Sequence, residues 1–133
     1  MDGLEDLRKA AMGALPSSWC PYSRFRVSAA LEDSSGRIFT GVNVENASYG
    51  LTICAERAAV SAAVTAGSRE FSRILVYSPD GEAMPCGACR QVLAEFCGMD
   101  FGVFVASAGG IREFRLGELL PHSFTLPGDS GAP

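Results

Sequence analysis

The sequence predicts an α/β fold in which one mixed five-stranded sheet lies between layers of helices. Two short apolar runs, at residues 73–77 and 101–106, have the continuous hydrophobicity of strands that are covered on both faces. A helical pattern over residues 86–96 separates these runs, as in a strand–helix–strand unit. Residues 25–44 precede them and have the alternation of a strand hairpin. Together these observations predict a three-layer α/β/α arrangement.

The first element is an amphipathic helix over residues 2–15. Its apolar residues recur at helical spacing, and Pro16 follows the last of them. The next segment alternates between apolar and mostly polar residues, which predicts a strand over residues 25–32 with one buried face. A turn at residues 33–36 then leads to the hairpin partner, residues 37–44.

Helices and strands alternate through the rest of the chain. An alanine-rich segment predicts a helix over residues 53–66, ahead of the first buried strand. The helix at residues 86–96 follows that strand, and a weaker strand over residues 111–116 follows the second. No internal repeat or linker interrupts the pattern, so we expect one domain over residues 1–126. Residues 127–133 are expected to form a disordered tail.

Composition restricts the class of protein and its partners. The chain has 133 residues, 47% of them apolar, and a formal net charge of −4. A chain of this size can form one hydrophobic core without disulfides. The sequence has no run of basic residues, which a polynucleotide-binding protein would be expected to show. No run approaches the roughly 20 apolar residues of a membrane span, and residues 1–15 lack a signal-peptide pattern. We expect a cytoplasmic protein with a small, neutral substrate and neither a nucleic-acid polymer nor a membrane as partner.

Three cysteines carry the strongest functional signal. Cys54 begins a Cys-Ala-Glu motif, and Cys86 and Cys89 form a Cys-x-x-Cys pair after a proline. Catalytic zinc sites have three protein ligands and leave the fourth position to water, whereas structural sites use four. Three thiolates favour zinc among the metals and suit a reducing compartment. The carboxylate of Glu56, two residues after the first ligand, indicates a hydrolytic metal site.

Other interpretations of the cysteines are less complete. A Cys-x-x-Cys pair alone also fits a redox centre or half of a structural zinc site, but a redox pair would not require Cys54 or Glu56. A closed four-cysteine site would require Cys20 or Cys97, and neither has ligand spacing to a second cysteine. We expect both to be buried free thiols. His122, the sole histidine, is expected at the surface or in packing.

The three proposed ligands fall where helices are expected to begin. The unpaired N–H groups and partial positive charge of a helix N-terminus lower the pKa of a thiol. Cys54 and Glu56 would lie on different sides of a long helix, but both can reach a metal beyond its N-terminal end. Arg57 is one helical turn from Cys54, so its guanidinium is expected to offset the negative charge of zinc with three thiolates. The alternative is a surface arginine paired with an exposed acid.

Five segments of the chain carry a family resemblance. They are residues 21–25, 41–49, 54–57, 85–91 and 119–121, which include both cysteine motifs. In order and separation they resemble the small, homotetrameric, zinc-dependent cytidine deaminases of the cytidine and deoxycytidylate deaminase superfamily. The resemblance covers nearly the whole chain and implies a cytidine deaminase-like fold.

The resemblance implies a reaction in pyrimidine salvage. Cytidine and 2′-deoxycytidine would be hydrolysed to uridine and 2′-deoxyuridine, with release of ammonia. In the family, one zinc ion per subunit activates water for attack on C4 of the pyrimidine. The glutamate that matches Glu56 moves the protons to N3 and to the departing amino group. One residue would thus act as a base and then as an acid.

The resemblance also implies the substrate contacts. Asn43 and Glu45 match residues that hydrogen-bond the ribose 3′-hydroxyl, Phe25 matches an aromatic contact with the pyrimidine, and Ala55 is a further substrate contact. A site built to pair with hydroxyls rejects analogues that lack them. Three more residues match contacts lent across an interface to a neighbouring active site: Ala47, Tyr49 and Phe124. The implied assembly is a homotetramer with active sites shared between subunits.

Two positions depart from the family pattern. After Phe25 the family usually has proline, valine and glycine, whereas this chain has Arg26, Val27 and Ser28. Alternation predicts that Arg26 and Ser28 point away from Phe25. A serine in place of glycine is expected to influence fine substrate preference.

Three alternatives to a nucleoside deaminase follow from the same residues. A deaminase of another aminated heterocycle is the first, as in the blasticidin S deaminases, which lack the full Asn-x-Glu-Asn segment and the arginine that matches Arg57. A non-catalytic, zinc-stabilised binding domain would hold its metal with four ligands and would not require Glu56. A polynucleotide editor is disfavoured by the charge and by the cysteine, rather than histidine, at Cys54.

Overall fold

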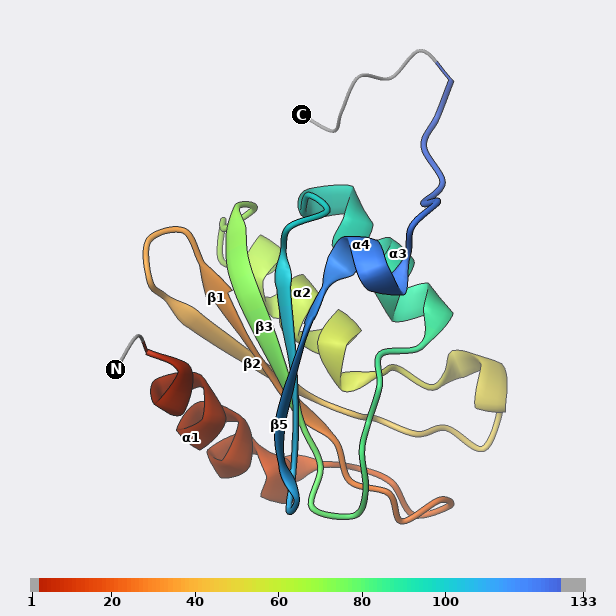
Figure 1. Ribbon diagram of the computed structural model, residues 1–133. Helices are drawn as coiled ribbons and strands as arrows, with labels where there is room; N and C mark the ends of the chain where they lie inside the picture. Colours follow the sequence, from red (N-terminus) through yellow and green to blue (C-terminus); the bar gives the residue numbers. More distant parts are fainter. Residues whose placement is uncertain (1–2, 128–133) are drawn as a thin grey trace.

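The computed structural model describes residues 3–127 and contains a five-stranded sheet with helices on both faces (Figure 1). The strands are β1 (Ser28–Asp33), β2 (Ile38–Val42), β3 (Phe71–Tyr77), β4 (Gly102–Ser107) and β5 (Gly110–Arg115). The α-helices are α1 (Leu4–Ala14), α2 (Ala55–Thr65), α3 (Gly87–Phe96) and the short α4 (Leu116–Leu119). Two short 3₁₀ helices, η1 and η2, cover Leu15–Ser17 and Tyr49–Leu51.

The sheet is mixed, with the strand order β2-β1-β3-β4-β5. β1 pairs antiparallel with β2 and β3, and β4 pairs antiparallel with β5. β3 and β4 are parallel, and the chain between them passes through α3, because parallel neighbours require a crossover connection. The predicted three-layer fold with a mixed five-stranded sheet is confirmed.

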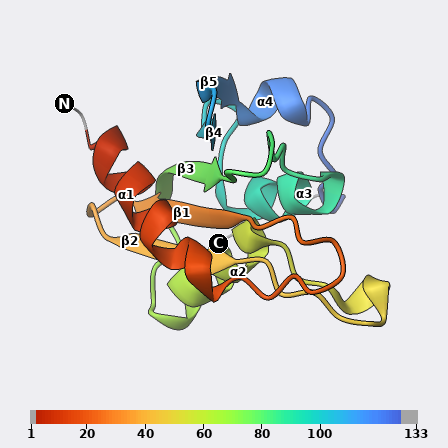
Figure 2. The same ribbon diagram turned by 90° about the horizontal axis from the view of Figure 1, so that it is seen from below.

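Helices cover the two faces of the sheet unequally (Figure 2). On one face, Leu7 and Ala11 of α1 pack against Ala30, Leu75 and Ala106 of the three central strands. On the other face, α2 and α3 cover a larger apolar cluster that includes residues of β1, β3 and β4. The two helices that carry the cysteine motifs therefore share one face.

Helix α2 lies unusually close to the backbone of β2. A Cβ atom at Gly41 would lie 2.4 Å from the backbone nitrogen of Ala59 and 2.5 Å from the carbonyl oxygen of Ala55. Only glycine leaves room for this approach. Gly41 thus sets the distance between the sheet and the helix that carries Cys54 and Glu56.

The structure corrects the prediction for the first strand in two ways. β1 begins at Ser28 rather than at residue 25, and both of its faces are buried rather than one. The reason is its place inside the sheet, between β2 and β3, with α1 on one face and α2 on the other. Ser28 is fully buried, and its hydroxyl donates a 2.6 Å hydrogen bond to the carbonyl oxygen of Ala11 in α1.

Most other elements differ from the prediction by one or two residues at their ends, and the last strand is followed by a helix that was not predicted. The sequence pattern predicts a last strand that continues to residue 116, but Leu116 begins α4. There the carboxylate of Glu118 accepts a 2.7 Å hydrogen bond from the backbone N–H of Arg115. A four-residue helix is too short to give a periodic pattern. Most of the expected C-terminal tail, residues 128–133, lies outside the described residues. Within residues 3–127, no helix has the length and hydrophobicity needed to cross a membrane.

Candidate metal centre and substrate cavity

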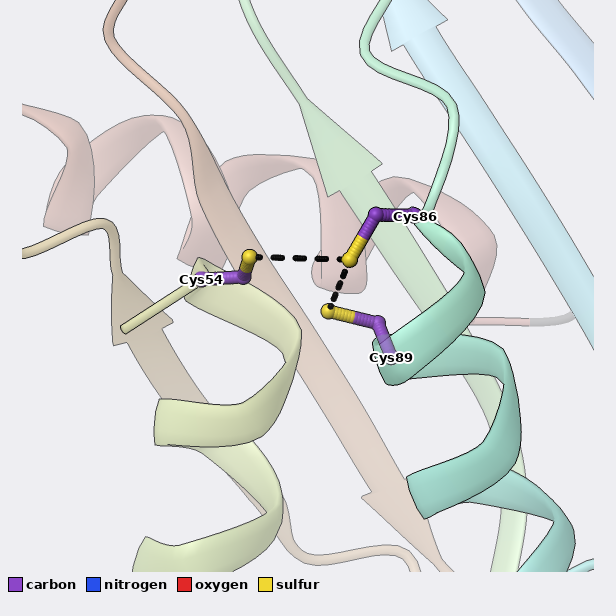
Figure 3. Close-up of side chains that lie close together, drawn as sticks. All are labelled: Cys54, Cys86 and Cys89. Carbon is purple, nitrogen blue, oxygen red and sulfur yellow. Dashed lines mark hydrogen bonds between the residues drawn. The ribbon is translucent and has the colours of Figure 1, made fainter. Parts of the chain in front are cut away.

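Three cysteine sulfurs meet between the starts of two helices (Figure 3). Cys54 comes from α2, whereas Cys86 and Cys89 come from α3. The Sγ atoms of Cys54 and Cys86 are 3.8 Å apart, and those of Cys86 and Cys89 are 3.4 Å apart. A tetrahedral zinc ion with Zn–S bonds of about 2.3 Å holds its sulfurs about 3.8 Å apart, so this donor set fits zinc.

Helix capping explains why these side chains converge. Cys54 and Cys86 are the N-cap residues of α2 and α3, with extended backbone and no side-chain capping hydrogen bond. Their side chains therefore point beyond the helix ends, where unpaired backbone N–H groups favour negative charge. Cys89 lies in the first turn of α3 and is fully buried. The prediction that these three cysteines lie at helix starts is confirmed.

The thiols influence each other's ionisation. Hydrogen bonding with Cys89, and then with Cys86, lowers the pKa of Cys54 to about 5 despite partial burial. The positive charge of Arg57 acts in the same direction. Hydrogen bonding with Cys54, together with burial, raises the pKa of Cys89 above its usual range. Binding of a metal by all three sulfurs must therefore release the Cys89 proton.

Arg57 lies beside the cysteine cluster rather than at the surface. Its Nη2 atom donates a 2.9 Å hydrogen bond to the carbonyl oxygen of Thr52. Its Nε–H is buried and, in the part of the chain that the structure describes, has no hydrogen-bond partner. The guanidinium thus has a free donor close to a thiolate site, as expected for a residue that offsets sulfur charge.

Glu56 is buried next to the cysteines. Its side chain lies in the first turn of α2, and the residue is 5% exposed. Burial raises the pKa of Glu56 to about 7, and the nearby Cys54 adds to this increase. A carboxyl group with this pKa can accept and return a proton near neutral pH.

A cavity of about 340 Å³ opens onto Glu56 and two of the cysteines. Its size is in the range of small-ligand sites. Apart from Cys54 and Cys86, it is lined by Phe25, Val27, Asn43, Thr52, Ala55, Glu56, Glu82, Ala83 and Met84. The structure thus places the predicted residues Phe25, Asn43 and Ala55 around the same cavity as Glu56.

Asn43 and Glu45 hold the segment that precedes β1. The Asn43 amide donates a 2.8 Å hydrogen bond to the Phe25 carbonyl and accepts one of 3.1 Å from the Val27 N–H. The Glu45 carboxylate accepts hydrogen bonds from the hydroxyl and N–H of Ser23 and from the N–H of Tyr22. The bond from the Ser23 hydroxyl is the main cause of the lowered pKa of Glu45.

Glu45 lines an adjoining cavity rather than that of Glu56. This second cavity has a volume of about 350 Å³ and is lined by Tyr22, Ser23, Glu45, Tyr49 and Thr52. Thr52 lines both cavities. Asn43 and Glu45 therefore face neighbouring spaces.

The three residues expected to act across an interface lie away from the cavity of Glu56. Tyr49 is 77% exposed, Phe124 is 69% exposed, and Ala47 is also exposed. The backbone of Phe124 is held by the side-chain amide of Gln91 through hydrogen bonds of 3.0 and 3.1 Å. The described chain alone does not bring these residues to the cluster.

The remaining cysteines and the histidine lie outside the cluster. Among the described residues, the sulfurs close enough to share a metal are those of Cys54, Cys86 and Cys89. Cys97 is partly buried, and burial raises its pKa to about 12. Cys20 is also partly buried, and burial raises its pKa. His122 is exposed. A four-cysteine site is therefore not formed.

Sequence reasoning missed the loop that forms one wall of the cavity. This loop connects β3 to α3 and contributes Glu82, Ala83 and Met84. The signal available was Asp80-Gly81, a turn dipeptide shortly before the Pro-Cys motif at residues 85 and 86. Nothing in the loop's composition indicates which side chains point inward.

Comparisons with known proteins identify the family. Residues 1–105 match the family described as the cytidine and deoxycytidylate deaminase zinc-binding region. A cytidine deaminase of Halalkalibacterium halodurans is 46% identical over 121 residues, which cover 90% of this chain and 92% of the relative. A crystal structure of cytidine deaminase from Burkholderia pseudomallei is 44% identical, with a TM-score of 0.85, and the match covers 90% of this chain and 98% of that chain.

A more distant relative bears on the main alternative. A blasticidin-S deaminase of Bacillus cereus is 28% identical over 112 residues, which cover 77% of this chain and 79% of the relative. The cytidine deaminase of Halalkalibacterium halodurans is more similar in sequence, at 46% identity, and matches over a larger share of both chains. The chain belongs to the zinc-binding cytidine and deoxycytidylate deaminase family.

Proposed function

We propose that this protein hydrolyses cytidine and 2′-deoxycytidine to uridine and 2′-deoxyuridine and releases ammonia. The observation that carries the proposal is the position of Glu56, a buried carboxyl group at the wall of a cavity that Cys54 and Cys86 also line. The names of the relatives support cytidine as the substrate. Extension to 2′-deoxycytidine, and a place in pyrimidine salvage, are part of the proposal.

Cys54, Cys86 and Cys89 would hold one zinc ion per subunit. Zinc bound there supplies the Lewis acidity that makes water a nucleophile at neutral pH. Three protein ligands would leave one coordination position to water, as hydrolytic sites require. The buried Nε–H of Arg57 would donate to this sulfur-rich site and reduce its negative charge.

Glu56 would move the protons of the reaction. It would accept a proton from the water that attacks C4 and deliver it to N3, and would then accept the second proton from the new C4 hydroxyl and deliver it to the amino group as the C4–N bond breaks. The products are the 4-oxo pyrimidine and ammonia. Its raised pKa suits both roles, because a group that titrates near the working pH accepts and donates with comparable ease.

The walls of the cavity would select the nucleoside. Phe25 and Met84 offer apolar contacts to the base, and Ala55 allows close approach at the start of α2. Asn43 on this cavity and Glu45 on the adjoining one would together bind the ribose 3′-hydroxyl with their remaining hydrogen-bonding capacity, since a carboxylate has about four acceptor sites. The hydrogen bonds that already hold both side chains would fix their orientation.

The active form would be a homotetramer with shared sites. Ala47, Tyr49 and Phe124 are exposed in the single chain, and we propose that each completes the cavity of a neighbouring subunit. Mixing tests this directly. Glu56→Gln and Phe124→Ala subunits, each impaired alone, should regain part of the activity when co-assembled, because some sites then combine an intact Glu56 with an intact Phe124.

Ultraviolet absorbance and ammonia release test the reaction itself. We expect turnover of both cytidine and 2′-deoxycytidine. The kcat/KM for 2′,3′-dideoxycytidine should be roughly 5- to 150-fold lower, because a polar group of the site is then left unpaired. Blasticidin S serves as the competing substrate. Turnover of blasticidin S without turnover of cytidine would overturn the proposal.

A further inference from the structure

The two walls of the substrate cavity come from segments far apart in the sequence. Phe25 and Val27 belong to the extended segment that leads into β1. Glu82, Ala83 and Met84 belong to the loop between β3 and α3. Since neither segment is part of a strand or helix, the width of the cavity depends on contacts between them.

Arg26 and Asp80 join these two segments. The guanidinium of Arg26 donates two hydrogen bonds to the Asp80 carboxylate, Nε to Oδ2 at 3.0 Å and Nη2 to Oδ1 at 2.7 Å. The backbone N–H of Arg26 donates a third to Oδ2 at 2.9 Å. These bonds hold the pKa of Asp80 at about 2. The side chain of Arg26 is not among those that line the cavity, whereas its neighbours Phe25 and Val27 are.

Asp80 is fixed to the sheet on its other side. Its backbone N–H donates a 3.1 Å hydrogen bond to the hydroxyl of Ser78. Ser78 is fully buried, and its own N–H donates to the carbonyl oxygen of Ala106 in β4. The ion pair is thus anchored on the sheet rather than on a loose loop.

The residue after Asp80 contacts the aromatic ring of the cavity. A Cβ atom at Gly81 would lie 3.0 Å from Cε1 and 3.4 Å from Cζ of Phe25. The ring of Phe25 therefore rests against the backbone of Gly81. Any shift of residues 80 and 81 relative to residue 26 changes the support of this ring.

We propose that Arg26 and Asp80 are positioning residues for the substrate: their ion pair holds the two cavity walls together and keeps Phe25 against the pyrimidine. The proposal rests on the proposed function, because it assigns the ring of Phe25 to a substrate base. It also assigns a role to Arg26, which stands where the family usually has proline.

A second ion pair fixes the same loop from the opposite side. Nη1 of Arg112 in β5 lies 2.7 and 2.8 Å from the two carboxylate oxygens of Glu82, a cavity-lining residue. The loop is thus held at Asp80 by the segment before β1 and at Glu82 by β5. Arg26 and Asp80 act on the side that faces Phe25.

The exposure of the pair predicts which quantity changes on mutation. The side chains of Arg26 and Asp80 are 50% and 26% exposed, and exposed ion pairs contribute little to stability. The two hydrogen bonds between the guanidinium and the carboxylate nevertheless fix the relative position of the two segments. Loss of the pair should therefore raise KM much more than it lowers kcat or the melting temperature, because a wall contact binds substrate and transition state alike.

We expect the rise in KM to increase with the number of hydrogen bonds that a variant removes. Arg26→Leu removes the two guanidinium bonds and keeps the backbone bond, whereas Asp80→Ala removes all three. We expect about a threefold rise in KM for Arg26→Leu and about a tenfold rise for Asp80→Ala, equivalent to about 1.4 kcal/mol of binding free energy. The double variant should match Asp80→Ala, and Arg26→Lys should recover part of the loss.

The experiment measures KM and kcat for cytidine, the dissociation constant of the product uridine, and zinc content. Glu5→Gln is the matched control, since it removes a comparably exposed ion pair with Arg8 on α1, a helix that contributes no residue to the cavity. Uridine affinity should weaken in parallel with KM. Unchanged KM and uridine affinity in Asp80→Ala, or equal changes in the Glu5→Gln control, would overturn the proposal. An inactive wild-type protein that still binds zinc would instead overturn the proposed function.

Discussion

The Sγ atoms of Cys54 and Cys86 lie 3.8 Å apart, each at the N-cap of a helix on the same face of the sheet. No local segment could create this contact, because it depends on how α2 and α3 pack against the sheet. The distances between the cysteine sulfurs are therefore set by the packing of the hydrophobic core. Substitutions that alter this packing should therefore change the positions of the cysteines and lower the activity.

Substitution of single cysteines should distinguish those that bind zinc from those that do not. We expect Cys86→Ser to weaken zinc binding by roughly 100-fold or more, since loss of even an outer contact commonly costs 10- to 100-fold, and to lose activity with the metal. Cys97→Ala should keep full zinc, because Cys97 lies outside the cluster. Metal analysis after dialysis measures both. Loss of zinc in Cys97→Ala would contradict the three-ligand assignment.

The contact between Gly41 and α2 should be sensitive to one methyl group. Gly41→Ala places a Cβ atom 2.4 Å from the Ala59 nitrogen, so α2 must shift. We expect a loss of about 1–3 kcal/mol in the free energy of unfolding, as for other overpacked cores, together with lower activity because Glu56 moves with the helix. Urea denaturation and cytidine turnover measure these effects.

Gly13 provides the control for this substitution. It lies within α1, where a Cβ atom would have no neighbour within 4 Å. Gly13→Ala should therefore raise stability by roughly 0.5–1 kcal/mol, because alanine is the better helix former. If Gly41→Ala were as harmless as Gly13→Ala, the close approach of α2 to β2 would be refuted.

Asp33 should make the stability of the fold depend on pH in the acid range. Burial raises the pKa of this carboxyl group, but hydrogen bonds from Ser68, Ser35 and the Arg37 backbone outweigh that effect and hold it at about 2, below the ordinary 3.8. Ionised Asp33 therefore stabilises the folded chain above about pH 4, and this contribution is lost as the pH falls from about 4 to 2.

Substitution by asparagine tests this assignment, because an amide NH₂ group would face hydrogen-bond donors. We expect Asp33→Asn to unfold at lower urea concentration than the wild type at pH 7, with the difference shrinking toward pH 2. Asp100→Asn, at an exposed position, is the control. A difference between wild type and Asp33→Asn that stays constant from pH 7 to pH 2 would be inconsistent with the depressed pKa.

Much of the fold could be predicted from local patterns. The continuous apolar runs of β3 and β4 indicated strands buried on both faces, and both are central in the sheet. The helical patterns also placed Cys54 and Cys86 where helices begin, and both are N-cap residues. The comparisons confirm the family that the combined motifs suggested.

Features that depend on tertiary contacts could not be predicted. Alternation continued from residue 25 into β1, so the sequence did not reveal that pairing with β2 and β3 begins only at Ser28. Likewise, Arg26 and Asp80 are ordinary loop residues in the sequence, and their contact becomes visible only when β1 and β3 lie side by side. The roles assigned to Ala47, Tyr49 and Phe124 require a second subunit and stay predictions.

The activity of Glu56→Gln at full zinc occupancy tests the central claim most directly. The amide keeps the size of the side chain but cannot carry the proton, so we expect the folded, zinc-loaded variant to lose about 10²- to 10⁴-fold in kcat for cytidine. Its zinc content and melting temperature should stay close to those of the wild type. Deamination of cytidine by this variant at the wild-type rate would contradict the account.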